Sequence, residues 1–379
     1  MKRTLLLTPG PTQIPPEICA VLGEPIIHHR TPQFQETLKT AVEGLKYVFQ
    51  TQEDVYLIPS SGTGAMEAAV ANLLSAGDKA LTVEGGKFGE RWTELCRAYG
   101  AAPEVVEVPW GKAVRPEQIK DALARDPGIK AVFTTLNETS TAVVTDIQKI
   151  AAVVKETDAV LVVDAVSGLG VVDLKMDAWG VDVVVSASHK GFMLPPGLAF
   201  IAVGPKAWPL VEAAKSPRYY FDLRKARKAM AKTDTAFTPA IGIIRALNKS
   251  LEHFQEKGLE AVFASYARLA KGTREAALAL GLTLFPEESC LSNALTAINM
   301  PEGIDGTKVV KIMRDTHGIS VAGGQAKLKG KIIRIAHMGC VDEYDILTGI
   351  ACLEKVLKEL GYAFEIGSGV KAAQQVFNR

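Results

Sequence analysis

The sequence has few cysteines, no excess of charge of one sign and no long apolar run. Its five cysteines are scattered, odd in number and form no C-x-x-C pair, which excludes a disulfide framework and a zinc site built on paired cysteines. The 43 basic residues almost cancel the 42 acidic ones, so net charge gives no reason to expect nucleic acid or a membrane surface as a partner. No stretch approaches the length of a membrane-spanning helix. We expect reduced thiols and a cytoplasmic location.

From residue 55 onward, short apolar strands alternate with amphipathic helices. Several strands consist almost entirely of Val, Ile, Leu and Ala, as do strands that are buried on both faces of a sheet. The alternation predicts an α/β fold with a mostly parallel, doubly wound sheet between helices. The expected strands are 55–58, 79–83, 104–106, 131–134, 159–163, 181–185 and 198–203, and the expected helices are 65–74, 89–99, 116–124, 146–155 and 205–214.

The pattern of the sequence changes after Lys215. A basic run, Arg224–Lys228, is expected on a solvated helix face or in a loop. Two helical patterns, 240–255 and 259–280, then lead into a smaller α+β unit with strands near 295–298, 319–322 and 331–336. The Pro- and Gly-rich start of the chain is typical of an extended arm. We therefore expect an N-terminal arm (residues 1–20), a large domain (21–255) and a small C-terminal domain (256–379).

The most informative residue is Lys190. The apolar strand 181–185 leads into Ser188-His189-Lys190, and Pro195-Pro196-Gly197 follows. A lysine at the mouth of a buried strand is badly placed for a solvated charge. Desolvation lowers the pKa of an ammonium and frees the lone pair that condenses with an aldehyde. If that aldehyde is pyridoxal phosphate, the sequence should also supply a phosphate cradle, an acid for the pyridine nitrogen and a platform for the ring.

Two segments fit the cradle and the acid. Ser61, Gly62 and Thr63 stand between a strand and a helix, where backbone N–H groups and the helix dipole favour an anion; an ordinary helix cap is the alternative. Asp164 ends a strand at the carboxyl edge of the sheet, where α/β proteins bind ligands. There it would keep a pyridine nitrogen protonated, and a turn or capping aspartate is the alternative.

Three further features fit the ring and a substrate. Phe88 lies in a glycine-rich turn and would stack on a planar ring or else cover the adjacent helix. The segment Asn137–Thr141 offers hydroxyls at the same sheet edge, which ordinary turn chemistry explains equally well. Arg334 interrupts an apolar strand, and its planar fork suits either a substrate carboxylate or a nearby acid. Each feature is modest alone, but all of them suit one cofactor.

Taken together, and in the order in which they follow along the chain, the motifs of this sequence resemble those of the class V aminotransferases of the fold type I pyridoxal-phosphate enzymes. Within that class they resemble the alanine–glyoxylate and serine–pyruvate group. The resemblance spans nearly the whole chain and implies a large domain with a seven-stranded sheet and a smaller C-terminal α+β domain. The motifs that carry it are Leu7-Thr8-Pro9-Gly10-Pro11-Thr12, Ser61-Gly62-Thr63 with Glu67, Asn137-Glu138-Thr139-Ser140-Thr141, Asp164-Ala165-Val166-Ser167, Ser188-His189-Lys190 with Pro195-Pro196-Gly197, and the strand around Arg334.

The resemblance also implies roles for single residues around the ring of pyridoxal phosphate. Lys190 would form the Schiff base with the cofactor and move protons. Asp164 would pair with the pyridine nitrogen, and Val166 would pack on one face of the ring. Phe88 stands where the family has its stacking aromatic residue, and Thr139 matches a hydroxyl near the ring oxygen.

For the phosphate, the resemblance implies a cradle made of Ser61, Gly62 and Thr63. His189 stands where many members of the family have glutamine, so a phosphate contact is implied for it as well. Thr238 matches a threonine that reaches the phosphate of the neighbouring subunit. The resemblance therefore implies a homodimer with shared active sites.

The implied activity is the transfer of an amino group. Arg334 would hold the substrate α-carboxylate, close to the backbone of Gly10. We expect a small donor, alanine or serine, a 2-oxo acid acceptor such as glyoxylate or pyruvate, and ping-pong kinetics. Aspartate is the alternative donor, because His28-His29-Arg30 would offer a second cation for its side chain.

Two other functions stay open. A cysteine desulfurase of the same fold needs a cysteine on a mobile loop, and the corresponding loop, Val321–Gln325, has none. Some proteins that resemble this group have been described as subunits of a soluble hydrogenase, which would make the chain a non-catalytic partner. The chain has no cysteine spacing typical of an iron–sulfur cluster.

Overall fold

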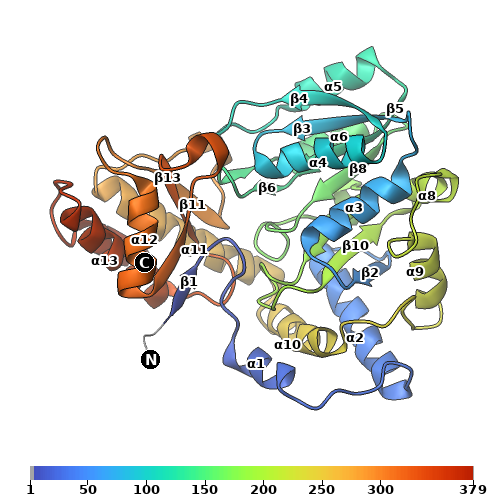
Figure 1. Ribbon diagram of the computed structural model, residues 1–379, viewed down its shortest axis with the longest axis horizontal. Helices are drawn as coiled ribbons and strands as arrows, with labels where there is room; N and C mark the ends of the chain where they lie inside the picture. Colours follow the sequence, from blue (N-terminus) through green and yellow to red (C-terminus); the bar gives the residue numbers. More distant parts are fainter. Residues whose placement is uncertain (1–3, 379) are drawn as a thin grey trace.

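The computed structural model describes residues 4–378, so residues 1–3 of the expected arm and residue 379 of the expected small domain lie outside the described residues. The larger of its two main sheets has seven strands in the order β2-β10-β9-β8-β5-β3-β4 (Figure 1). Within it, β10 runs antiparallel to both of its neighbours and the other pairs are parallel, which confirms the mostly parallel sheet. The strands are β2 (Val55–Ile58), β3 (Lys79–Glu84), β4 (Ala102–Glu107), β5 (Ile129–Thr135), β8 (Val160–Asp164), β9 (Val183–Ala187) and β10 (Ala199–Val203).

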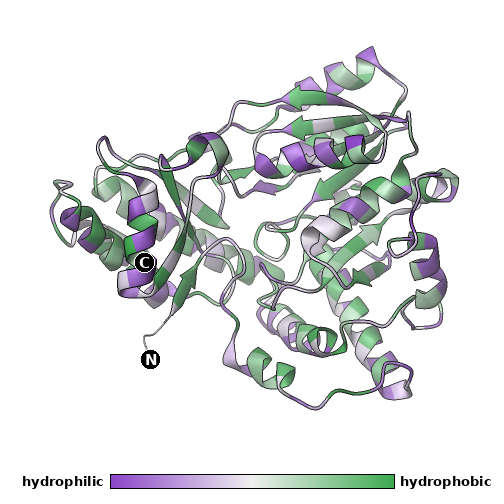
Figure 2. Cartoon of the chain, in the orientation of Figure 1, coloured by the Kyte–Doolittle hydropathy of each residue, from purple (hydrophilic) through white to green (hydrophobic). Residues whose placement is uncertain are grey.

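Both faces of this sheet are buried, because alternate residues of a strand point to opposite sides. In β8, Val160 and Val162 pack in one hydrophobic cluster with α3 and α4, and Leu161 packs in a second cluster with α2 and α10. The central strands are accordingly hydrophobic along their length (Figure 2). The helices of this unit are α1 (Pro16–Leu22), α2 (Pro32–Phe49), α3 (Gly62–Leu73), α4 (Lys87–Ala98), α5 (Pro116–Arg125), α6 (Ile147–Val154), α7 (Met176–Trp179), α8 (Trp208–Ala213), α9 (Leu223–Met230) and α10 (Ile241–Lys257).

A second sheet has four strands in the order β1-β12-β13-β11. Its first strand is not predicted from the sequence: β1 pairs in parallel with β12, with Leu5 opposite Ile319. The start of the expected arm thus belongs to the sheet of the C-terminal unit (Figure 1). The elements of this unit are β1 (Leu5–Leu7), α11 (Leu259–Ala279), β11 (Leu295–Asn299), α12 (Gly306–His317), β12 (Ile319–Gly323), β13 (Ile332–Ala336), α13 (Glu343–Glu359) and α14 (Ser368–Phe377).

The basic run Arg224–Lys228 lies on α9 and has local partners. Arg224 forms an ion pair with Asp222, with 2.9 Å between Nη2 and Oδ2, and the guanidinium of Arg227 lies 4.1 Å from the centroid of the Trp208 ring. These contacts account for part of the run without a binding partner. Among residues 4–378, no helix has both the length and the apolar character needed to cross a membrane.

Candidate active site

Most of the predicted residues gather at the carboxyl edge of the seven-stranded sheet. β8 ends at Asp164, and β9 ends shortly before Lys190. β3 ends shortly before Phe88, and β5 ends shortly before Thr139. Parallel strands present their carboxyl ends at the same edge, so residues that are distant in the sequence meet there. Arg334 comes from β13 in the other sheet and reaches this edge through a hydrogen bond to the Thr139 carbonyl oxygen.

The amine of Lys190 is buried and donates a hydrogen bond to the carbonyl oxygen of Pro9. Burial lowers the pKa of Lys190 to about 8, against the opposing charge of Asp164 and with the help of the charges of Arg334 and Arg91. The neutral amine is therefore about a tenth of the population at pH 7, far more than for a solvated lysine. This is the form that attacks an aldehyde or accepts a proton.

The opening arm of the chain crosses directly over Lys190. Thr12 Oγ1 donates a hydrogen bond of 2.9 Å to the Lys190 carbonyl oxygen. Gly10 has a φ of +122°, and a Cβ atom at this position would lie 2.2 Å from Lys190 Nζ. Both the backbone conformation and the lack of space require glycine. The backbone at Gly10 therefore lies against the reactive amine.

Asp164 is 3% exposed and accepts a hydrogen bond of 2.8 Å from the Val166 N–H at Oδ1. Burial raises the pKa of Asp164 to about 6. The hydrogen bond from the Val166 N–H opposes this rise, and the charge of Glu138 adds to it. The charges of Arg91 and Lys190 oppose it. A buried carboxyl of this kind is stabilised in its ionised form by a cationic partner, such as a protonated pyridine nitrogen.

Replacing Asp164 with asparagine should change how the stability of the cofactor-free protein depends on pH. The unfolded carboxyl titrates near 3.8 and the folded one near 6, so the folded state binds more protons in that window and loses stability as the pH rises through it. The free energy of unfolding of the wild type, relative to Asp164→Asn, should fall by about 2–3 kcal/mol between pH 4 and pH 7. Urea unfolding of both proteins at pH 4 and pH 7 measures this change. If the wild type and Asp164→Asn differed by the same free energy of unfolding at both pH values, the raised pKa of Asp164 would be contradicted.

The N-terminus of α3 is suited to bind an anion. Ser61 is the N-cap residue, and its side chain makes no capping hydrogen bond. A Cβ atom at Gly62 would lie 2.7 Å from the side chain of Val166, so only glycine lets the helix start this close. Thr63 Oγ1 accepts a hydrogen bond of 3.1 Å from Arg91 Nη1. Free N–H groups, a hydroxyl and a guanidinium together match a phosphate group.

His189 contributes a nitrogen without a partner. Its Nδ1 atom is buried and has no hydrogen-bond partner in the part of the chain that the structure describes. Burial lowers the pKa of His189 to about 4, and the Lys190 charge lowers it further, so the ring is neutral at physiological pH. A buried polar atom of this kind calls for a bound ligand or a water molecule.

Two residues at the site, Arg91 and Glu138, were not singled out from the sequence. The Arg91 guanidinium lies 4.8 Å from the centroid of the Phe88 ring. Glu138 is 4% exposed and accepts hydrogen bonds from the N–H groups of Phe88 and Gly89. The sequence held a signal for the first: Arg91 follows Phe88 by three residues and so shares its helix face. Glu138 stands in a segment that was singled out only for its hydroxyls.

Arg334 is 5% exposed, and backbone carbonyl oxygens hold its guanidinium. Nε and Nη2 donate to the Gly323 oxygen at 2.9 and 2.7 Å, and Nη1 donates to the Thr139 oxygen at 2.7 Å. Burial lowers the pKa of Arg334 to about 10, and the charge of Glu138 opposes this. No carboxylate of residues 4–378 forms an ion pair with it, so the salt bridge considered as an alternative is not seen in this range.

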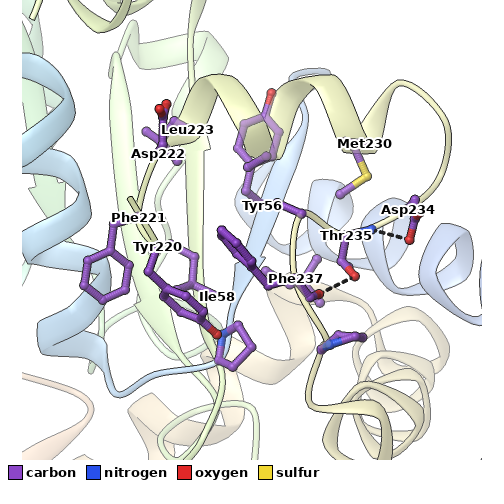
Figure 3. A pocket seen from close by; sticks show the side chains of 15 residues that line it. Tyr56, Ile58, Tyr220, Phe221, Asp222, Leu223, Met230, Asp234, Thr235 and Phe237 are labelled. Carbon is purple, nitrogen blue, oxygen red and sulfur yellow. Dashed lines mark hydrogen bonds between the residues drawn. The ribbon is translucent and has the colours of Figure 1, made fainter. Parts of the chain in front are cut away.

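Thr238 does not join this cluster through any hydrogen bond in the described chain. It is exposed on the loop before α10, next to Phe237. Phe237 stacks on Tyr220, with 4.9 Å between the ring centroids, and both line a surface hollow together with Tyr56 (Figure 3). Arg30 is likewise away from the cluster, in an exposed loop before α2.

The residues present fit pyridoxal phosphate. A buried amine of lowered pKa, Lys190, suits the aldehyde, and the buried carboxyl of Asp164 suits the ring nitrogen. The glycine at position 62 lets the side chain of Val166 pack against the start of α3, close to Asp164. The N-terminus of α3, with Thr63 and Arg91, suits the phosphate.

Comparisons with known proteins identify the family of the chain. The profile of the family described as "Aminotransferase class-V" matches residues 5–339. A protein named "Soluble hydrogenase, small subunit" from a Synechococcus species is 44% identical over 99% of both sequences. The L-aspartate–glyoxylate aminotransferase of Paracoccus denitrificans is 42% identical, over 99% of this chain and 96% of that protein. The crystal structure of ureidoglycine–glyoxylate aminotransferase from Bacillus subtilis matches with a TM-score of 0.97 at 28% identity, over 100% of this chain and 99% of that one.

The family match extends over most of the chain, and the similarity to the relatives is nearly end to end. The matched range includes the arm at Gly10, the carboxyl of Asp164, the amine of Lys190 and the guanidinium of Arg334. The fold, the residues and the comparisons thus lead to one conclusion: the chain belongs to the class V aminotransferase family and is a pyridoxal-phosphate-dependent transaminase.

Proposed function

We propose that the enzyme transfers the amino group of a small neutral amino acid, alanine or serine, to glyoxylate or pyruvate. The observation that carries the proposal is the buried guanidinium of Arg334, which two backbone carbonyl oxygens hold in place. A carboxylate is the partner that such a planar fork binds best. The amino donor and the 2-oxo acceptor both carry an α-carboxylate, so a single anchor serves both halves of a ping-pong reaction.

In this proposal, the chain's own residues bind the substrate and move its protons. Bound pyridoxal phosphate supplies an aldehyde and an electron sink for the charge that develops at the substrate Cα. Lys190 would take the proton from the donor Cα and pass it to the former aldehyde carbon of the cofactor, and in the second half-reaction it would carry a proton back to the Cα of the product amino acid. A pKa of about 8 lets its amine accept and donate protons near neutral pH. The Pro9 carbonyl oxygen orients that amine. Asp164 would hold a proton on the ring nitrogen, and Ser61, Thr63, Arg91 and His189 would bind the phosphate.

The choice of donor rests on the number of cations at the site. Aspartate would need a second cation for its side-chain carboxylate. Arg30, which the sequence offers for that role, lies in an exposed loop and pairs with Asp234 at 3.6 Å within the same subunit. This favours a small neutral donor. Aspartate remains the second candidate, because the relative from Paracoccus is named for it. Glyoxylate is supported as the acceptor because the proteins from Paracoccus and Bacillus are both named for it.

A homodimer is part of the proposal, with Thr238 serving the site of the neighbouring subunit. Thr238 is exposed and makes no hydrogen bond within residues 4–378. The hollow beside it is lined by Tyr220 and Phe237 (Figure 3), and Tyr219 and Tyr220 are 74% and 43% exposed. Exposed aromatic surface of this kind is typical of protein contacts. A cytoplasmic location is also proposed, since all five cysteines are free thiols.

A panel of amino donors against glyoxylate, pyruvate and 2-oxoglutarate tests the proposal. Alanine or serine with glyoxylate should give the highest kcat/KM, with the parallel reciprocal plots of a ping-pong reaction, and aspartate should be slower by about tenfold or more. Light scattering on the same preparation should give about twice the chain mass of 40.6 kDa. A preference for aspartate would select the second candidate. If no donor gave amino transfer, the proposed activity would be refuted. If light scattering gave the mass of a monomer, the proposed homodimer would be refuted.

A further inference from the structure

Helix α4 begins without a cap of its own. Its N-cap residue is Gly86, which has no side chain to accept a hydrogen bond. The first three N–H groups of the helix are instead capped from a distant segment, near β6 (Asn137–Glu138) (Figure 1). Ser140 Oγ accepts from the Lys87 N–H at 3.0 Å, and Glu138 Oε2 accepts from the N–H groups of Phe88 and Gly89 at 3.0 and 2.9 Å.

The second carboxylate oxygen of Glu138 is also fully engaged. Oε1 accepts from the N–H of Ser140 at 3.1 Å and from the Ser140 hydroxyl. Burial raises the pKa of Glu138, and the hydrogen bonds from Ser140, Gly89 and Phe88 oppose this rise. Three of its four partners are backbone N–H groups, which can only donate, so the surroundings favour the ionised carboxylate as acceptor. A Cβ atom at Gly86 would lie 2.4 Å from Glu138 Cδ. The lack of a side chain at Gly86 thus allows Glu138 to approach the helix this closely.

The two segments that Glu138 joins carry opposite halves of the site. Helix α4 carries Phe88 and Arg91, and Arg91 reaches Thr63 at the N-terminus of α3. The segment after Glu138 carries the Thr139 carbonyl oxygen, which accepts from Arg334 at 2.7 Å. A displacement of Glu138 would consequently shift Phe88 and Arg91 through helix α4. It would also shift Arg334 through the Thr139 carbonyl oxygen.

We propose that Glu138 is a positioning residue whose carboxylate fixes Phe88 and Arg91 toward the cofactor and, through Thr139, fixes Arg334 toward the substrate carboxylate. This inference deepens the proposed function and rests on it for the substrate half. The cofactor half rests on the fit of the chain to pyridoxal phosphate. Glu138 touches neither the cofactor nor the substrate in this proposal and acts only through the residues that it holds.

The test compares Glu138→Gln with a matched control elsewhere in the chain. Glutamine is close in shape, but its NH₂ group would face two donors in either orientation. Glu354 caps another helix in the same way as Glu138, away from the residues of the site. It is also 4% exposed, and its carboxylate accepts hydrogen bonds from the N–H groups of Gly367 and Val370 at the start of α14. Glu354→Gln therefore reproduces the loss of a buried helix cap without touching the site.

For both variants, three quantities are measured: the dissociation constant of pyridoxal phosphate, the KM of the amino donor, and hydrogen exchange of residues 86–92 in the cofactor-free protein. We expect Glu138→Gln to raise the dissociation constant and the donor KM by about tenfold each, the size expected for losing charge-assisted hydrogen bonds, and to speed exchange at residues 86–92. Glu354→Gln should lower the unfolding temperature and leave all three quantities unchanged.

The proposal is overturned if Glu138→Gln matches Glu354→Gln in cofactor affinity, donor KM and exchange. If Glu138→Gln does not fold, Ser140→Ala serves instead, because it removes the hydroxyl that links Lys87 to Glu138 and keeps the carboxylate. Ser140→Ala should raise the dissociation constant of pyridoxal phosphate and the donor KM by a smaller factor. If neither constant changed, the result would count against the proposal. A wild type that binds the cofactor but transfers no amino group refutes the proposed function, while cofactor affinity and exchange still decide the role of Glu138.

Discussion

Replacing Lys190 with alanine is expected to lower kcat for amino transfer by about 10⁴-fold or more. Among residues 4–378, Lys190 is the only lysine that is buried, and its pKa of about 8 sets it apart from an ordinary solvated amine. In the proposed mechanism, one side chain supplies both the attachment to the cofactor aldehyde and the proton transfer at the substrate Cα. Its loss removes both, and steady-state kinetics with the best donor measures the effect.

The same substitution should leave the fold intact. Relief of the desolvation cost of the buried amine offsets the loss of its hydrogen bond to the Pro9 carbonyl oxygen, so the unfolding temperature of the cofactor-free variant should change by only a few degrees. Replacing the exposed Lys39 with alanine is the control and should change neither activity nor the absorption of the bound cofactor. If Lys190→Ala kept the long-wavelength absorption of pyridoxal phosphate bound to an amine, and more than a few per cent of the activity, the role assigned to Lys190 would be wrong.

Replacing Arg334 with lysine should raise the donor KM by about 10²-fold while the cofactor still binds. Lysine keeps the positive charge but lacks the planar fork that now donates to Gly323 and Thr139 at once. The KM of the donor and the KM of the acceptor should rise by similar factors, because in the proposed function Arg334 binds the α-carboxylate in both half-reactions. Half-reaction kinetics, followed by the absorption of the cofactor, measures the two effects separately.

Arg218 provides a matched control for Arg334. Its guanidinium is also held by backbone carbonyl oxygens, those of Val211, Ala214 and Ser216, at the end of α8. Arg218→Lys loses the same kind of hydrogen bonds away from the site, and it should lower stability without changing KM. An unchanged donor KM in Arg334→Lys, or an equal change in Arg218→Lys, would contradict the assignment of Arg334 as the carboxylate anchor.

The sequence predicted the strands of the main sheet well because they are buried on both faces. A strand such as β8 is apolar at every position up to Asp164, and this makes it readable without any knowledge of its neighbours. The strand β1 was missed for the opposite reason. It has three residues, and its pairing with β12 joins segments from opposite ends of the chain. Local patterns hold no information on such a contact.

The candidate site was predictable where a residue type alone limits the chemistry, as with Lys190 and Arg334. It was not predictable where the partner is backbone. The Thr139 carbonyl oxygen that holds Arg334 and the N–H groups that hold Glu138 belong to segments that meet only in the folded chain. Backbone donors and acceptors are the same in every residue, so they leave no mark on the sequence. Their positions required the structure.

The central claim is that Lys190 holds the cofactor, and one measurement tests it directly. Borohydride treatment of the holoenzyme fixes pyridoxal phosphate to the amine that carries it, and peptide mass mapping then locates that amine. The account predicts one labelled lysine per chain, in the peptide that contains Ser188-His189-Lys190. A label on any other lysine, or none in a preparation that transfers amino groups, would contradict it.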